Sequence, residues 1–199
     1  MTERIPLFPL PQGLLPDGML HLNIFEVRYL DLIKRCQREA TPFGVVGLVQ
    51  GHEVQVPDEV PHLHRIGTLA HLQTVDAPQP ALLQVLCRGG LRFALDSHER
   101  GPYGVWYAQV RYLSTDTVEP IPPELQPVAN MLGRLIADAQ KAGSRQALPL
   151  FAPYRLDECG WVANRWVELL PLSADDKQRL LAELDPVKRL HQIARCINV

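Results

Sequence analysis

Apolar and polar positions alternate over short segments in the first 118 residues, a pattern typical of β-strands. Residues 5–11 interleave apolar side chains with prolines, and because proline removes a ladder donor they predict an edge strand or extended arm. Further extended segments are expected at residues 19–22, 43–50, 67–74, 81–87, 91–96 and 103–113. Short strands at this spacing, separated by turn signals and by a polar loop at 54–65, favour a β-sandwich or barrel.

One helix interrupts these strands. From residue 25 the apolar positions recur with helical spacing, at Phe25, Tyr29, Leu32, Ile33 and Cys36. The helix should end before Pro42, because a residue that precedes proline avoids the α region. We therefore expect Phe25 and Tyr29, together with Phe8, to belong to the core.

The pattern changes to a helical period beyond the proline cluster at 120–123. Helices are expected at residues 125–139, 162–170, 174–184 and 187–196. Gly143 should end the first, Ser173 should cap the third, and Asp185 should cap the fourth ahead of Pro186. The sequence thus predicts an α+β chain, with a β-rich subdomain at 1–118 and a helical bundle at 119–199.

Composition narrows the function classes. The 199 residues are 46% hydrophobic and 21% charged, with a net charge of −2, so no basic surface for nucleic acid or membrane is indicated. The longest apolar run, 43–49, is too short to span a bilayer, and the N-terminus lacks a signal-like apolar segment. Four widely spaced cysteines favour a reducing, cytoplasmic location.

Motifs for catalysis are not found in the sequence. It contains no G-x-x-x-x-G-K-[ST] phosphate loop, no G-x-S-x-G and no S-x-x-K, so we expect no enzyme, no catalytic residue and no cofactor. His62 and His64, with His52 and His71 nearby, could begin a metal site, but exposed loop histidines are the favoured interpretation and no metal is expected.

The remaining titratable groups have ordinary interpretations. The acidic pairs at 58–59, 157–158 and 175–176 are expected to be solvated charges or helix starts. Cys87, beside Arg88, could be an activated nucleophile, but a buried structural thiol is favoured because no partner residue follows a known pattern.

A nucleic-acid surface is the alternative from a different class. Basic and aromatic residues are interleaved on the predicted strands, where they could stack on single-stranded RNA: Arg88, Phe93, Arg92, Arg100, Tyr103, Trp106, Tyr107 and Arg111. The favoured interpretation is that the aromatic side chains enter the core while the arginines face water, because the net charge gives no electrostatic footprint.

The segments 5–10, 15–18 and 20–29 resemble the opening signature of the Lon protease N-terminal (substrate-binding) domain family. Similar segments continue along nearly the whole chain, at 43–46, 67–70, 88–93 (a glycine turn in this comparison), 171–173, 176–178 and 184–190. Proline is usual in the family at the positions of His21 and Val27, and this chain departs there while keeping the apolar pattern, so the fold is expected to be unchanged.

The resemblance implies a PUA-like β pseudo-barrel with one helix, followed by a helical bundle, the two together forming one domain of the Lon N-terminal type. In Lon proteases this region precedes an ATPase and a serine–lysine peptidase and helps to recognise substrates. We expect a stand-alone member without those catalytic domains. The implied function is a non-enzymatic protein- or peptide-binding module, and a quality-control adaptor for unfolded clients is the role we expect. RNA is the alternative partner, and no membrane partner is expected.

Glu26 and Arg28 match the charged pair of the family signature. One interpretation is that they hold the helix start against the barrel, with Glu26 near the positive helix end. The other is that Arg28, with Glu26 and Tyr29, contributes to a peptide-binding groove. Clients could also bind by adding a strand to a sheet edge, or in an apolar groove between barrel and bundle.

Overall fold

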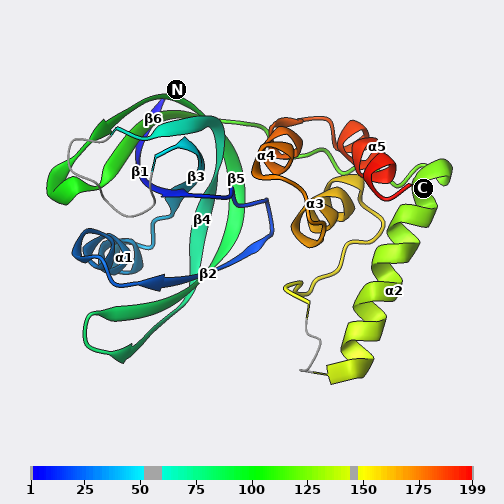
Figure 1. Cartoon of the computed structure of the whole chain (residues 1–199), viewed down its shortest axis with the longest axis horizontal. Helices are drawn as coiled ribbons and strands as arrows, with labels where there is room; N and C mark the ends of the chain where they lie inside the picture. Colours follow the sequence, from blue (N-terminus) through cyan, green and yellow to red (C-terminus); the bar gives the residue numbers. More distant parts are fainter. Residues whose placement is uncertain (1, 52–59, 144–147, 199) are drawn as a thin grey trace. The chain divides into compact units, whose positions relative to one another are not determined.

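The computed structural model describes residues 2–51, 60–143 and 148–198 (Figure 1). The chain divides into two compact units, residues 1–115 and 116–199, and each is described by itself below. The first is a sheet with one long helix and the second is helical, so the predicted α+β class is confirmed.

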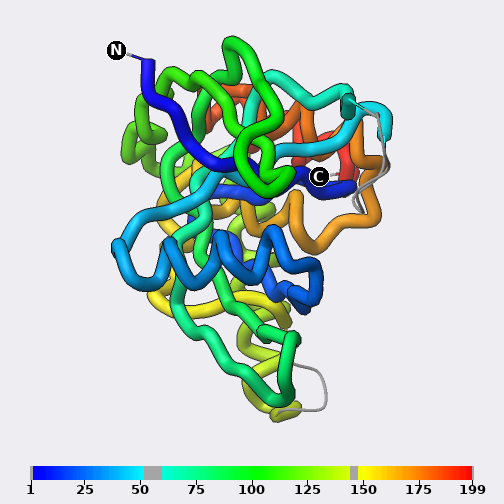
Figure 2. The backbone as a smooth tube through the Cα atoms, turned by 90° about the vertical axis from the view of Figure 1, so that its left-hand side faces the viewer, coloured from blue at the N-terminus to red at the C-terminus, as the bar shows by residue number. Residues whose placement is uncertain are grey.

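Unit 1 is built on a six-stranded sheet with the order β2-β5-β4-β3-β1-β6. An additional β5–β6 pairing closes β1, β3, β4, β5 and β6 into a barrel, and β2 lies beside the first half of β5. The elements are β1 (Glu3–Leu10), β2 (Met19–Ile24), α1 (Val27–Glu39), β3 (Phe43–Gln50), β4 (His62–Gln79), β5 (Leu82–Arg100), the 3₁₀ turn η1 (Pro102–Gly104) and β6 (Trp106–Tyr112). Figure 2 shows α1 passing close to the hairpin of β4 and β5.

The main core of unit 1 forms where α1 packs on the strands. The predicted helical stripe is buried from Tyr29 onward, and Tyr29 stacks on Phe8 of β1 with 4.0 Å between ring centroids. Offset stacking of this kind adds to the stabilisation from burying two large aromatic side chains. A second cluster, centred on Leu7, Phe93 and Val110, fills another part of the barrel.

The expectation of an edge strand at residues 5–11 is wrong, because β1 lies between β6 and β3. The prolines are tolerated because the two neighbours share the strand. Residues Glu3–Leu7 pair with β6 and Leu7–Leu10 pair with β3, so Pro6 is opposite Tyr107 only and Pro9 is opposite Val46 only. Each proline therefore has one side on which no ladder donor is needed.

The two strands expected at 81–87 and 91–96 form one continuous strand, β5, and the glycine turn between them is absent. Gly89 and Gly90 lie within β5 at a register shift, where three steps along β5 from Gly89 to Arg92 match two steps along β4 from Ala70 to Thr68. A Cβ on Gly89 would stand 2.0 Å from the Leu15 carbonyl oxygen, so close backbone approach explains this glycine. The loop expected at 54–65 is also shorter, because β4 begins at His62; residues 52–59 lie outside the described part of the chain.

Unit 2 contains η2 (Pro123–Leu125), α2 (Gln126–Ala142), α3 (Cys159–Leu169), α4 (Ala174–Ala182) and α5 (Pro186–Cys196). The predicted caps are confirmed. The Ser173 hydroxyl accepts from the Asp176 amide, the Asp185 carboxylate accepts from the amides of Val187 and Lys188, and α2 stops before Gly143 at φ 69°. None of the described helices meets the length and hydropathy needed to cross a membrane.

A buried arginine organises the helices of unit 2. Arg189 of α5 is fully buried and donates to both carboxylate oxygens of Asp116, at 2.6 and 3.1 Å, and to the Asn164 side chain at 3.0 Å. It also donates to the Glu183 carbonyl. A buried charge needs such a full set of partners, so Arg189 ties the start of unit 2 to α3 and α5.

Candidate functional site

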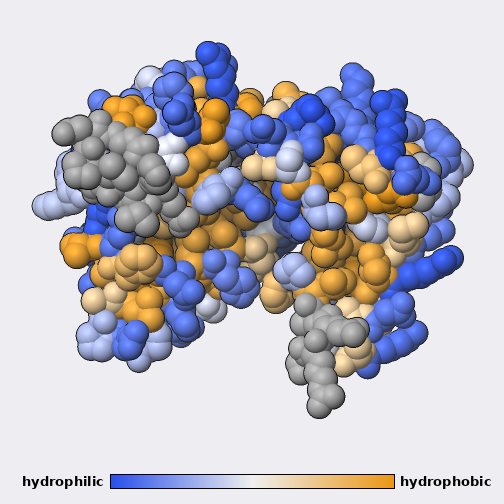
Figure 3. All heavy atoms as spheres, viewed as in Figure 1, coloured by the Kyte–Doolittle hydropathy of each residue, from blue (hydrophilic) through white to orange (hydrophobic). Residues whose placement is uncertain are grey.

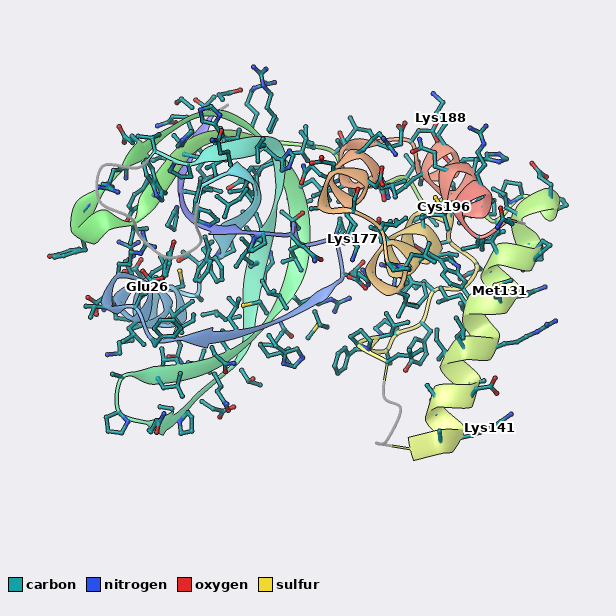
Figure 4. All side chains as sticks on the ribbon, viewed as in Figure 1. Glu26, Met131, Lys141, Lys177, Lys188 and Cys196 are labelled. Atoms are coloured by element: carbon teal, nitrogen blue, oxygen red, sulfur yellow. The ribbon has the colours of Figure 1, made fainter. Side chains whose placement is uncertain are left out.

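The start of α1 is fixed by the charged pair singled out in the sequence. Arg28 is 6% exposed and pairs with the Glu26 carboxylate at 3.0 Å. Its Nη1 donates to the Gly104 carbonyl of η1 at 3.2 Å, and its guanidinium lies 4.4 Å from the centroid of the Tyr29 ring. Glu26, labelled at the start of α1 in Figure 4, makes no side-chain cap and instead neutralises Arg28.

The structure thus brings Glu26, Arg28 and Tyr29 together, as the sequence suggested. It also buries two of them, since Tyr29 is 2% exposed beneath the guanidinium. These side chains hold α1 against η1, which is the first of the two interpretations given above. A ligand at the start of α1 would contact mainly the neighbouring residues that Glu26, Arg28 and Tyr29 hold in position.

Those residues are apolar and strongly exposed. Phe25 is 62% exposed and Val27 72%, on either side of Glu26, and Tyr103 beside Gly104 is 86% exposed. We call Phe25, Val27 and Tyr103 the α1 corner. Its backbone is unusual as well, because Tyr103 has φ 59°, a left-handed conformation that is strained for a bulky residue.

The core position predicted for Phe25 is therefore wrong. The helix begins at Val27, so Phe25 precedes the first turn and is not carried to the buried face by the helical period. Tyr103 was expected to begin a strand, but β6 starts at Trp106. Both errors concern element ends, where one residue of shift reverses the direction of a side chain.

Unit 2 carries a separate apolar groove of about 300 Å³. It is lined by Ile136, Ala139, Gln140, Gly143, Leu148, Leu150, Phe151 and Tyr154. Phe151 remains 50% exposed, and the Gln140 side chain donates to the Tyr154 hydroxyl at 3.4 Å. Figure 3 shows apolar surface gathered over α3 and the segment before it.

Sequence reasoning missed this groove. One signal was present, since residues 148–154 interleave apolar side chains with prolines in the same way as the first strand does. That pattern does not reveal that the segment lies against the C-terminal half of α2.

The whole chain from residue 4 to residue 199 matches the family model described as the ATP-dependent protease La (LON) substrate-binding domain. The chain belongs to the Lon substrate-binding domain family. The resemblance found in the sequence is thereby confirmed, and the family is one of protein substrate-binding modules.

Solved structures of the same family agree with this assignment. A Lon N-terminal domain protein from Xanthomonas campestris is 30% identical, with a TM-score of 0.76, and the match covers 97% of this chain and 98% of that one. The N-terminal domain of a Lon protease from the Mycobacterium avium complex is 14% identical with a TM-score of 0.62, covering 97% of each chain, which shows a shared fold. A comparison with curated protein sequences found no match.

Three of the four arginines considered for RNA are paired with a carboxylate or buried. Arg88 pairs with Asp17 at 2.6 Å, and Arg111 forms a bidentate pair with Asp96 that lowers the pKa of that carboxylate. Arg92 is only 3% exposed, so the expectation that all these arginines face water is wrong for it. The RNA alternative is not supported.

The structure also shows the surroundings of the cysteine considered as a nucleophile and of the histidines considered for a metal site. Burial raises the pKa of the Cys87 thiol to about 12, which keeps it protonated and fits the favoured structural interpretation. His62 and His64 lie on β4 rather than in a loop, and the described residues include no cluster of three or more His, Cys, Asp or Glu side chains suited to a metal. His52, Asp58 and Glu59 lie outside the described residues.

Proposed function

We propose that this chain holds unfolded polypeptide clients and that the α1 corner is its main contact surface. The observation that carries the proposal is the exposure of three large apolar side chains at one corner of a domain from a substrate-binding family. Exposed apolar clusters on soluble domains are commonly interaction sites. Aromatic residues are also the commonest anchors of protein interfaces.

The rigidity of the corner supports the same proposal. Arg28 reaches the Gly104 carbonyl and thereby fixes the two backbone segments that present Phe25 and Tyr103. A surface held in place before binding loses less conformational entropy when a partner docks. In this proposal Glu26, Arg28 and Tyr29 form the peptide-binding site by positioning their exposed neighbours.

The proposed role is that of a non-enzymatic adaptor in protein quality control. The chain would present clients to other machinery and would itself need no cofactor. The free thiols Cys36, Cys87, Cys159 and Cys196 support a reducing compartment such as the cytoplasm.

The test is a binding titration with a fluorescein-labelled, S-alkylated and permanently unfolded protein, read by anisotropy. The corner variant carries Phe25→Ser, Val27→Ser and Tyr103→Asn, the last chosen because asparagine tolerates positive φ. We expect at least a tenfold loss of affinity, the scale of removing one interface anchor.

Two matched variants locate the surface. Val118→Ser removes a side chain that is 77% exposed elsewhere, and Phe151→Ser alters the groove of unit 2. Both should bind clients within about twofold of the parent chain. Equal binding by the corner variant and the parent would contradict the proposal, and loss confined to Phe151→Ser would transfer the site to unit 2.

A further inference from the structure

The strand β2 is paired on one side only. Among the described strands it contacts β5 alone, through six consecutive positions from Met19–Arg88 to Ile24–Leu83 without a register shift. No second strand of the described residues lies beside its other edge. The geometry of this edge can be worked out residue by residue.

The hydrogen bonds of Gly89 show which residues of β2 direct their backbone amide and carbonyl groups toward β5. The Gly89 amide donates to the Gly18 carbonyl at 2.8 Å, and its carbonyl accepts from the Asp17 amide at 2.9 Å, so both groups of Gly89 face the β2 side. Asp17 has φ 60°, as the first residue of a bulge with this bonding does.

Bonded and non-bonded pairs alternate along an antiparallel ladder. Counting from Gly89, the residues of β2 that bond to β5 are Leu20, Leu22 and Ile24, opposite Cys87, Val85 and Leu83. Met19, His21 and Asn23 must then direct their amide and carbonyl groups away from β5. The open edge of β2 thus offers a regular row of three donors and three acceptors.

After the bulge at Asp17, the edge from Met19 to Ile24 lacks the features that usually protect an edge strand. Natural edge strands are blunted by charged residues, proline or bulges. The sequence of β2, MLHLNI, contains no charge and no proline, and its pairing is regular. Leu22 and Ile24 are buried while His21 and Asn23 are exposed, so the strand has one apolar face and one polar face.

The edge also leads directly into the α1 corner. Phe25 follows Ile24 and is exposed, and by the alternation of a strand it lies on the side of His21 and Asn23. A segment paired with β2 would reach Phe25 with one set of its side chains. Because the edge of β2 continues into the α1 corner, the surface proposed to bind clients, we take a client segment to be the strand that pairs with this edge.

We propose that β2 binds an extended client segment by strand addition. It forms hydrogen bonds with the client backbone and therefore accepts any uncharged sequence in which apolar residues alternate. This inference rests on the proposed function, because the partner is the same client polypeptide. It adds the mode of binding: the hydrogen bonds go to the client backbone, and the corner receives a side chain.

The probes are three labelled ten-residue peptides of alternating valine and threonine. The first peptide is unmodified. The second is N-methylated at its valine residues, and the third is N-methylated at its threonine residues. N-methylation removes the amide donor, so the set that faces β2 should lose at least tenfold in affinity while the other set keeps it. Equal affinity of the two methylated peptides overturns the proposal.

Variants of His21 test the same edge from the side of the protein. His21→Pro removes the outward-facing amide without removing a bond to β5, whereas His21→Ala keeps the amide and removes only an exposed side chain. Peptide binding should fall at least tenfold in the first and stay within twofold in the second. If His21→Pro does not fold, the two methylated peptides decide by themselves.

The outcomes separate this inference from the proposed function. Clients that bind the parent chain and His21→Pro equally would refute strand addition and leave the α1 corner as the site. Absence of binding by every client would refute the proposed function itself. A dimer that His21→Pro abolishes, seen by sedimentation without peptide binding, would show that the occupant is a second copy and would overturn the inference.

Discussion

The guanidinium of Arg28 donates to the carbonyl of Gly104 at 3.2 Å, although 76 positions separate the two residues in the sequence. This bond joins the start of α1 to η1. It explains why a charged residue in the family signature is 6% exposed.

Replacing Arg28 with alanine should destabilise unit 1 by about 2–3 kcal/mol. The change removes a largely buried ion pair and leaves Glu26 and the Gly104 carbonyl without their donor. Arg38→Ala is the matched control, because its pair with Glu39 is exposed and such pairs contribute little. Urea unfolding of both variants measures the difference, and equal midpoints would contradict the account.

Replacing Arg189 with alanine should cost at least about 3 kcal/mol in unit 2. The substitution removes the buried guanidinium that pairs with Asp116 and donates to Asn164. Arg179→Ala breaks an exposed pair with Asp176 on α4 and serves as the control. Loss of the helical signal at a lower urea concentration in the first variant alone is the expected result.

The cap of α5 should make stability depend on acid pH. Amide hydrogen bonds, first that from Lys188, hold the pKa of Asp185 below its ordinary value. A lowered carboxylate pKa stabilises the fold above the pKa of the unfolded chain, and this contribution is lost as the pH falls through the folded pKa. Asp185→Asn keeps an acceptor without the charge, so its melting temperature should fall less than that of the parent chain below about pH 4. Parallel curves for the two proteins would count against this role.

The four thiols should differ sharply in reactivity. Cys196 is exposed on α5, whereas Cys36, Cys87 and Cys159 are buried and burial raises the pKa of each. A thiol reagent at neutral pH should therefore modify Cys196 first, and the others only on unfolding. Cys196→Ser should remove the fast phase. Rapid labelling of a buried thiol in the folded chain would show that unit 1 or unit 2 opens locally.

Local signals in the sequence predicted local structure well. The caps at Ser173 and Asp185 depend on hydrogen bonds to amides two or three residues away, so the sequence contains everything that the cap needs. The stripe from Tyr29 to Cys36 is likewise a property of one helix.

What the sequence did not reveal depends on distant partners. The place of β1 inside the barrel requires two other strands that share it, and the continuity of β5 through Gly89 requires the Leu15 backbone beside it. The exposure of Phe25 follows from where α1 begins, which the period alone does not fix. The surfaces proposed for binding arise at these same places, which is why the signature identified the family and left the contact surface open.

The most direct test of client binding at the α1 corner and the β2 edge is amide hydrogen exchange of the parent chain with and without a saturating unfolded client. We predict slower exchange at residues 19–29 and 101–105, the segments that form the edge, the start of α1 and η1. Unchanged exchange in both segments while the client is bound would contradict the account.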